Sequence, residues 1–82
     1  MALLAKFMIE TQLYSEIETI LGLESGTISG HERFEDLVGW DSLAVVMLMA
    51  VAAEKFNCEL TGEAIAACAT INDLKALIES RG

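Results

Sequence analysis

The sequence predicts an all-α fold: a small four-helix bundle of three main helices plus one short helix, with a long loop between helices 1 and 2. Proline is absent, and no long stretch alternates β-branched with polar residues as a strand would. Apolar residues instead recur at spacings of three and four, which is the period of an amphipathic helix. At 82 residues the chain has the size of one domain, and we assign residues 1–82 to it.

The first helix is expected over residues 3–21, ended by Gly22, because glycine enters the left-handed conformation that closes helices at little cost. Its apolar positions define one buried face: Leu13, Ile17, Ile20 and Leu21. Residues 24–40 are expected to form a loop, since glycine and serine residues interrupt any helical period there. Long loops in small domains are usually functional or fixed to the core. Three apolar residues of this loop are expected to fix it to the core: Ile28, Phe34 and Leu37.

The second helix is expected over residues 42–56, with Asp41 or Ser42 capping its free amides and Asn57 ending it. Its predicted buried stripe follows helical spacing: Val45, Leu48, Met49, Ala52 and Phe56. A short helical turn over residues 61–67 and a last helix over residues 72–79 complete the bundle. Thr70 and Asp73 have the spacing of a capping box. The inner face of the last helix is predicted to contain Ile71, Leu74, Leu77 and Ile78.

The charge of the chain excludes whole classes of partner. Thirteen acidic and 5 basic side chains give a formal net charge of −8. A nucleic-acid binder needs a cationic surface, and an anionic membrane repels a chain of this sign, so we expect neither partner. The longest apolar run, residues 43–53, is too short for the ~20 residues of a membrane span. Opposite charge steers encounter, so basic patches are expected on the partners.

Two cysteines and one histidine provide neither a disulfide framework nor a metal site, and we predict no metal. Without a secretory signal, the expected compartment is the reducing cytoplasm. His31 is expected to be an exposed loop residue, since no nucleophile lies at a suggestive spacing from it. Glu32, Glu35 and Asp36 lack the spaced oxygen ligands of a calcium loop, and we interpret them as a solvated acidic face.

A hydroxyl at the start of a strongly apolar helix makes the segment from Phe34 to Leu43 distinctive. Ser42 follows a Gly-Trp turn that keeps the chain at the surface, and a helix N-terminus stabilises negative charge such as a phosphate. Asp41 would repel a phosphate, so we expect it to cap the helix or to present charge to a basic modifying enzyme. On these two residues alone, an ordinary helix cap is the simpler interpretation.

The whole pattern resembles the acyl carrier proteins of fatty-acid and polyketide synthesis. The Asp41-Ser42-Leu43 motif lies between Phe34-x-x-Leu37 and Val46-x-Leu48, and Thr70-Ile71-x-Asp73-Leu74 follows at the spacing of that family. The resemblance implies that Ser42, flanked by Asp41 and Leu43, carries 4′-phosphopantetheine, transferred from coenzyme A by a magnesium-dependent phosphopantetheinyl transferase. It implies a carrier rather than an enzyme, one whose arm presents acyl thioesters to acyl-loading, condensing and acyl-transfer enzymes. We expect a monomer.

The second helix departs from the family in its outward residues. Many carriers present several acids there, whereas this chain is mostly apolar after Ser42, and Glu54 is the only acid among the outward positions. The predicted partner-docking residues are Ala44, Met47, Val51 and Glu54, with Ala50 beside them. We therefore expect docking to depend on apolar contact more than on charge.

The resemblance also implies that an acyl chain can enter between the helices, at a pocket predicted to involve Leu48, Ala52, Cys68 and Ile71. Small residues crowd the short helix: Ala66, Ala67, Cys68 and Ala69. They leave room for a bulky or long chain, or they let the helices pack closer, and both alternatives remain open. We expect Cys68 to be a small buried hydrophobe rather than a reactive thiol.

Two other functions compete with the acyl carrier. One is a peptidyl or aminoacyl carrier of a nonribosomal pathway, although the aspartate before the serine favours an acyl carrier. The other is an unmodified acidic helical adaptor that binds a protein partner. The pathway stays open among fatty-acid, specialised lipid and polyketide synthesis, and the apolar second helix favours a specialised role.

Overall fold

The computed structural model describes residues 2–81, with side chains from Met8 to Arg81. Met1 and Gly82, both part of the predicted domain, lie outside the described residues. Five elements follow one another: α1 (Ala2–Leu21), the 3₁₀ helix η1 (Phe34–Asp36), α2 (Ser42–Lys55), α3 (Gly62–Ala66) and α4 (Ile71–Arg81). The all-α prediction is confirmed, and the four α-helices begin and end within two residues of their predicted bounds.

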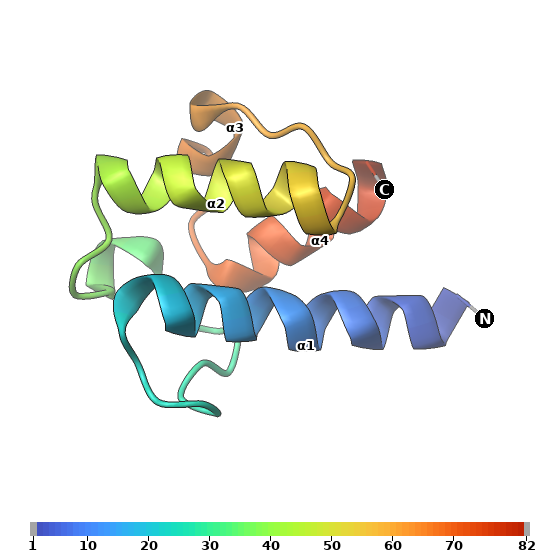
Figure 1. The fold of residues 1–82 in the computed structure, drawn as a ribbon, viewed down its shortest axis with the longest axis horizontal. Helices are drawn as coiled ribbons and strands as arrows, with labels where there is room; N and C mark the ends of the chain where they lie inside the picture. Colours follow the sequence, from blue (N-terminus) through green and yellow to red (C-terminus); the bar gives the residue numbers. More distant parts are fainter. Residues whose placement is uncertain (1, 82) are drawn as a thin grey trace.

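The bundle is built around α1 and α2, which lie side by side and run in opposite directions (Figure 1). The short α3 packs against α2, and α4 packs against α1. None of the helices between residues 2 and 81 is long and apolar enough to cross a membrane.

The core is formed by the predicted apolar faces of the helices. Its fully buried side chains include Leu13, Ile17, Leu48, Ile65, Ile71, Leu74 and Ile78. The loop anchors Ile28 and Phe34 are also buried, and Leu37 packs against the core. In α2 the predicted stripe is confirmed at Leu48 and Ala52, which are buried, while Val45, Met49 and Phe56 are half-buried and pack against the core. Ala44 is buried as well.

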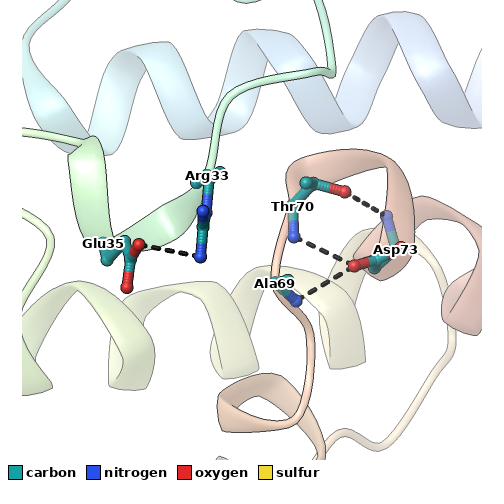
Figure 2. A network of polar contacts seen from close by, with 5 residues as sticks. All are labelled: Arg33, Glu35, Ala69, Thr70 and Asp73. Atoms are coloured by element: carbon teal, nitrogen blue, oxygen red, sulfur yellow. Dashed lines mark hydrogen bonds and ion pairs between the residues drawn. The ribbon is translucent and has the colours of Figure 1, made fainter.

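The helix ends follow local chemistry. Gly22 has a φ of 71° and ends α1 in the left-handed conformation, and Asn57 does the same after α2 with a φ of 51°. The capping box before α4 is confirmed: the Thr70 hydroxyl accepts a hydrogen bond from the Asp73 amide at 3.2 Å. The Asp73 carboxylate accepts in return from the amides of Ala69 and Thr70, and these bonds lower its pKa (Figure 2).

Two glutamates fold the loop between α1 and α2. The buried Glu18, 5% exposed, accepts hydrogen bonds from the amides of Gly26 at 3.0 Å and Ile28 at 2.9 Å. Glu32 accepts from the amides of Ser29 and Gly30 at 2.9 and 2.8 Å. Partial burial opposes ionisation of Glu32, but these bonds outweigh it and lower the pKa. Glu32 is half-exposed, so its side chain is partly solvated as expected, and it also orders the loop backbone.

Backbone hydrogen bonds then fasten the loop to the start of α4. The Phe34 amide donates to the Ala69 carbonyl at 3.0 Å, and the Asn72 amide donates to the Gly30 carbonyl at 2.8 Å. Gly30 has a φ of 101°, and a Cβ there would lie 2.0 Å from the Tyr14 hydroxyl oxygen, so this position requires glycine. These contacts hold η1 and the residues that precede α2 against the bundle.

Replacing Glu18 with alanine should destabilise the protein by roughly 2–4 kcal/mol, because two loop amides lose a charged acceptor inside the protein. Urea unfolding followed by circular dichroism measures the change. Glu18→Gln, which keeps one carbonyl oxygen, should lose less. Glu24→Ala, at an exposed position in the same loop, is the matched control and should change stability little. Equal stability of Glu18→Ala and the wild type would show that the carboxylate does not order the loop.

Candidate functional site

The candidate site is the beginning of α2, where Ser42 is the first helical residue and is exposed. Asp41 is the N-cap: its carboxylate accepts from the Ala44 amide at 3.0 Å, which confirms the predicted cap. No hydrogen bond to another described residue occupies the Ser42 hydroxyl. A second group can therefore reach this oxygen without breaking the helix cap.

The turn before α2 determines which side chains face inward. The Phe34 and Trp40 rings lie against each other, with centroids 4.7 Å apart, so Trp40 is held toward the bundle. Gly39 has a φ of 89°, which places the chain in a conformation that side chains other than glycine rarely adopt. The Trp40 amide donates to the Leu37 carbonyl at 3.2 Å and closes the turn. Asp41 and Ser42 consequently emerge at the surface.

The residues at this helix start fit a covalently attached phosphodiester. The amides of the first turn and the positive end of the helix dipole stabilise negative charge beside the Ser42 oxygen. The Asp41 carboxylate is already directed to the Ala44 amide, so its charge is partly compensated by the helix that it caps. The exposed Ser42 hydroxyl is the nucleophile that forming a phosphodiester at this position requires.

The outer face of α2 is apolar, as predicted, but its residues differ in part from those expected. Leu43, Val46 and Met47 are 66%, 59% and 43% exposed, and Ala50 is exposed beside them. We call these four residues the outer stripe. Val46, Met47 and Ala50 lie three, four and seven residues after Leu43, so the four residues share one face of the helix.

Two of the predicted docking residues need correction. Ala44 is buried at 3% exposure, because it lies four residues before Leu48 and therefore shares the inner row of the helix. It cannot contribute to a docking surface, and Val51 is only half-exposed. Met47 and Glu54 are exposed as predicted. The exposure of Val46 was not predicted, although its spacing of three from Leu43 places both residues on one face of the helix.

Three of the predicted acyl-pocket residues lie in the hydrophobic core, and the fourth, Cys68, lies at its edge. Leu48, Ala52 and Ile71 are 0% exposed and pack within the core. Cys68 instead lines a separate pocket of about 270 Å³ together with Phe34, Trp40 and Ile65. Burial raises the pKa of the Cys68 thiol, and the nearby Asp73 raises it further, although the residue is only half-buried.

The small residues near α3 do not widen the interior. Ala66, Ala67 and Ala69 are exposed, so the space that their size leaves lies at the surface. Arg33 and Trp40 border the same pocket as Cys68 and were not predicted as site residues. The place of Arg33 depends on its contact with Thr70, which no local spacing in the sequence indicates.

The loop histidine and two of the three neighbouring acids are exposed. His31 is exposed, as predicted, and Glu35 and Asp36 are exposed on η1. Among the side chains that the structure describes, no group of three or more His, Cys, Asp or Glu residues is arranged to hold a metal ion.

Comparison with known proteins agrees with this geometry. A family model described as "Phosphopantetheine attachment site" matches residues 11–78, which is most of the chain. An acyl carrier protein of Prochlorococcus marinus (strain MIT 9515) is 34% identical over 61 residues, covering 74% of this chain and 76% of that protein. Members of this family use 4′-phosphopantetheine as their covalent cofactor and are carriers rather than enzymes. The chain belongs to the family of phosphopantetheine-binding acyl carrier proteins.

Proposed function

We propose that Ser42 is the residue that carries 4′-phosphopantetheine and that the arm presents acyl groups as thioesters to a series of enzymes. The observation that supports this is an exposed serine hydroxyl, free of other bonds, at the first residue of a capped helix. The family match includes this residue within its span, residues 11–78. The other exposed serines lie in the loop or in α1 and α4, away from a capped helix start.

In the loading step the Ser42 oxygen attacks the coenzyme A phosphorus that is nearer to the pantetheine. A new P–O bond forms at Ser42, the bond between the two phosphates of coenzyme A breaks, and adenosine 3′,5′-bisphosphate leaves. The hydroxyl proton passes to a base of the transferase, which is a separate, magnesium-dependent enzyme. The amides at the start of α2 then stabilise the negative phosphodiester.

The carrier contributes position rather than catalysis. The thiol of the arm holds an acyl group as a thioester, and tethering raises the effective concentration of that group at each docked enzyme. The enzymes that we expect to dock are the phosphopantetheinyl transferase and the acyl-loading, condensing and acyl-transfer enzymes of fatty-acid, specialised lipid or polyketide synthesis in the cytoplasm. The chain would act as a monomer, because its net charge of −8 opposes association with a second copy.

Loading should be visible as a mass change. Incubation with coenzyme A, magnesium and a phosphopantetheinyl transferase of broad specificity should add one phosphopantetheine to the wild type, measured by intact-mass spectrometry. Ser42→Ala should remove the gain completely, and Ser25→Ala, which removes an exposed hydroxyl from the loop, should keep it. A folded wild type that gains no mass would support the unmodified adaptor instead, and a loaded Ser42→Ala protein would place the attachment elsewhere.

We also propose that partner enzymes contact the outer stripe of α2. These side chains are directly beside Ser42, so an enzyme that acts on the arm passes over them. Exposed large apolar residues on one helix face are characteristic of interaction surfaces. Glu54, farther along the helix and exposed, provides the acidic contact for a basic residue of the partner.

Met47→Glu should reduce kcat/KM of the loading reaction by roughly fivefold or more, which corresponds to ~1 kcal/mol for a contact residue at an interface. The cause would be a charge buried against an apolar partner surface. Gln12→Glu is the matched control: it adds the same charge at an exposed position of α1 and should leave the rate nearly unchanged. A rate that collapses with added salt and is insensitive to Met47→Glu would show that docking depends on charge.

A further inference from the structure

A surface pocket with several hydrogen-bond acceptors lies between α1 and the loop that follows it. We call it the Tyr14 pocket. It has a volume of about 330 Å³, and its walls come from α1 and from residues 25–28 of the loop. In Figure 1 this part of the loop lies on the opposite side of α1 from α2, which carries the outer stripe. The acidic and hydroxyl-bearing residues that line the pocket are Glu10, Glu18, Thr11, Tyr14, Ser15 and Ser25.

Glu18 gives this pocket a carboxylate oxygen with unused bonding capacity. The residue is 5% exposed, and its Oε2 atom accepts the hydrogen bonds from the Gly26 and Ile28 amides. Among the described residues, none donates a hydrogen bond to the other oxygen, Oε1. Every fully buried side-chain nitrogen or oxygen that the structure describes has a hydrogen-bond partner, so Oε1 must retain access to open space. Because Glu18 lines the Tyr14 pocket, a ligand in the pocket can donate a bond to this oxygen.

The other polar groups of the pocket also favour a ligand that donates hydrogen bonds. The Tyr14 hydroxyl donates its proton to Oδ1 of Asn72 at 2.7 Å, which leaves the hydroxyl oxygen as an acceptor. Glu10 adds a second carboxylate, which is partly exposed and lies 3.4 Å from the Lys75 amine. An ionised carboxylate accepts hydrogen bonds and donates none. The two carboxylates would therefore attract a cation that carries N–H groups and repel an anion.

The size and the lining of the pocket suit an arginine side chain. At ~30 Å³ for each water-sized group, 330 Å³ accommodates roughly eleven non-hydrogen atoms, which is enough for a guanidinium on its aliphatic stem. The planar guanidinium carries several N–H donors and stacks on aromatic rings, so one group can bond to Glu18 and lie against Tyr14. Ile28 also lines the pocket and provides an apolar contact for the stem.

We propose that the Tyr14 pocket binds an arginine side chain of a basic partner protein. The net charge of −8 attracts such a partner toward the chain. Oε1 of Glu18 accepts a hydrogen bond from the guanidinium, and Glu10 provides a second negative charge, for which Lys75 competes. The pocket and Ser42 lie on different elements, so binding does not require the phosphopantetheine arm. The unmodified protein is therefore sufficient for the test.

The probe is N-acetyl-arginine N-methylamide, which presents the side chain on a protein-like backbone. Added to isotope-labelled protein at constant ionic strength, it should shift the NMR signals of the Gly26 and Ile28 amides, because both are bonded to Glu18. The citrulline analogue is the matched control, with nearly the same shape and no charge. It should bind roughly tenfold more weakly, because it lacks a charge-assisted hydrogen bond. Equal binding of the two compounds, or no shift with the arginine compound, would overturn the proposal.

Two variants with opposite effects test where the probe binds. Glu10→Gln removes one charge from the pocket and should raise the Kd of the probe roughly threefold. Lys75→Met removes the competing cation and should lower the Kd by a similar factor. Glu63→Gln removes an exposed acid on α3 and should leave the Kd unchanged. A Kd that responds equally to Glu10→Gln and Glu63→Gln would show that the probe is attracted by the overall charge rather than by the pocket.

Agmatine tests the source of the guanidinium, because it carries the same group on a free small molecule. Shifts of the Gly26 and Ile28 signals by both compounds would support an arginine of a protein. Shifts by agmatine alone would show that the pocket excludes a peptide backbone, and the partner protein would be ruled out. Ser42→Ala should bind the probe as the wild type does. The loading experiment and this titration can therefore fail independently.

Discussion

Burial of a single row of side chains on α2 determines the character of the candidate site. Ala44, Leu48 and Ala52 occupy the inner row, and at 3.6 residues per turn this choice directs Leu43, Val46 and Met47 outward. A helix that is apolar on nearly every side has no polar face to define its orientation, so the packing of neighbours decides it. The same rotation leaves Ser42 at the exposed start of the helix. The packing of the core therefore also determines that the Ser42 hydroxyl is exposed.

The loop before α2 is ordered by charge rather than by regular structure. Between Leu21 and Ser42 the only helix is the short η1, and apolar anchors alone would not define the backbone path. The carboxylates of Glu18 and Glu32 together accept hydrogen bonds from four backbone amides. These bonds replace those that a helix or sheet would supply. An ionised acceptor makes stronger bonds than a neutral one. The loop can therefore be long and still hold the paired rings of Phe34 and Trp40 in place.

Features that depend on neighbours in the sequence could be predicted, and features that depend on distant contacts could not. The helices, the Asp41 cap and the Thr70–Asp73 box follow from local spacing and were predicted within two residues. The predicted stripe of α2 was confirmed at Leu48 and Ala52, but Ala44 was predicted on the outer face and is buried, because both faces of the helix are apolar. The roles of Glu18 and Arg33 depend on contacts with amides and side chains elsewhere in the fold, and an acid or a cation in a sequence does not reveal them.

In the docking that we propose, the acidity of the chain and the apolar outer stripe would serve different stages of recognition. The described cations are largely engaged: Lys55 pairs with Glu16, Lys75 with Glu10, and Arg33 with Glu35, so the remaining acids give the surface its negative potential. Such a potential accelerates encounter with a basic partner but contributes little to how long the complex lasts. In the docking that we propose, apolar contact at Leu43, Val46 and Met47 would instead lengthen the bound state. A carrier must leave each enzyme after its reaction. A narrow stripe of four residues is therefore better suited to repeated docking and release than a broad apolar face.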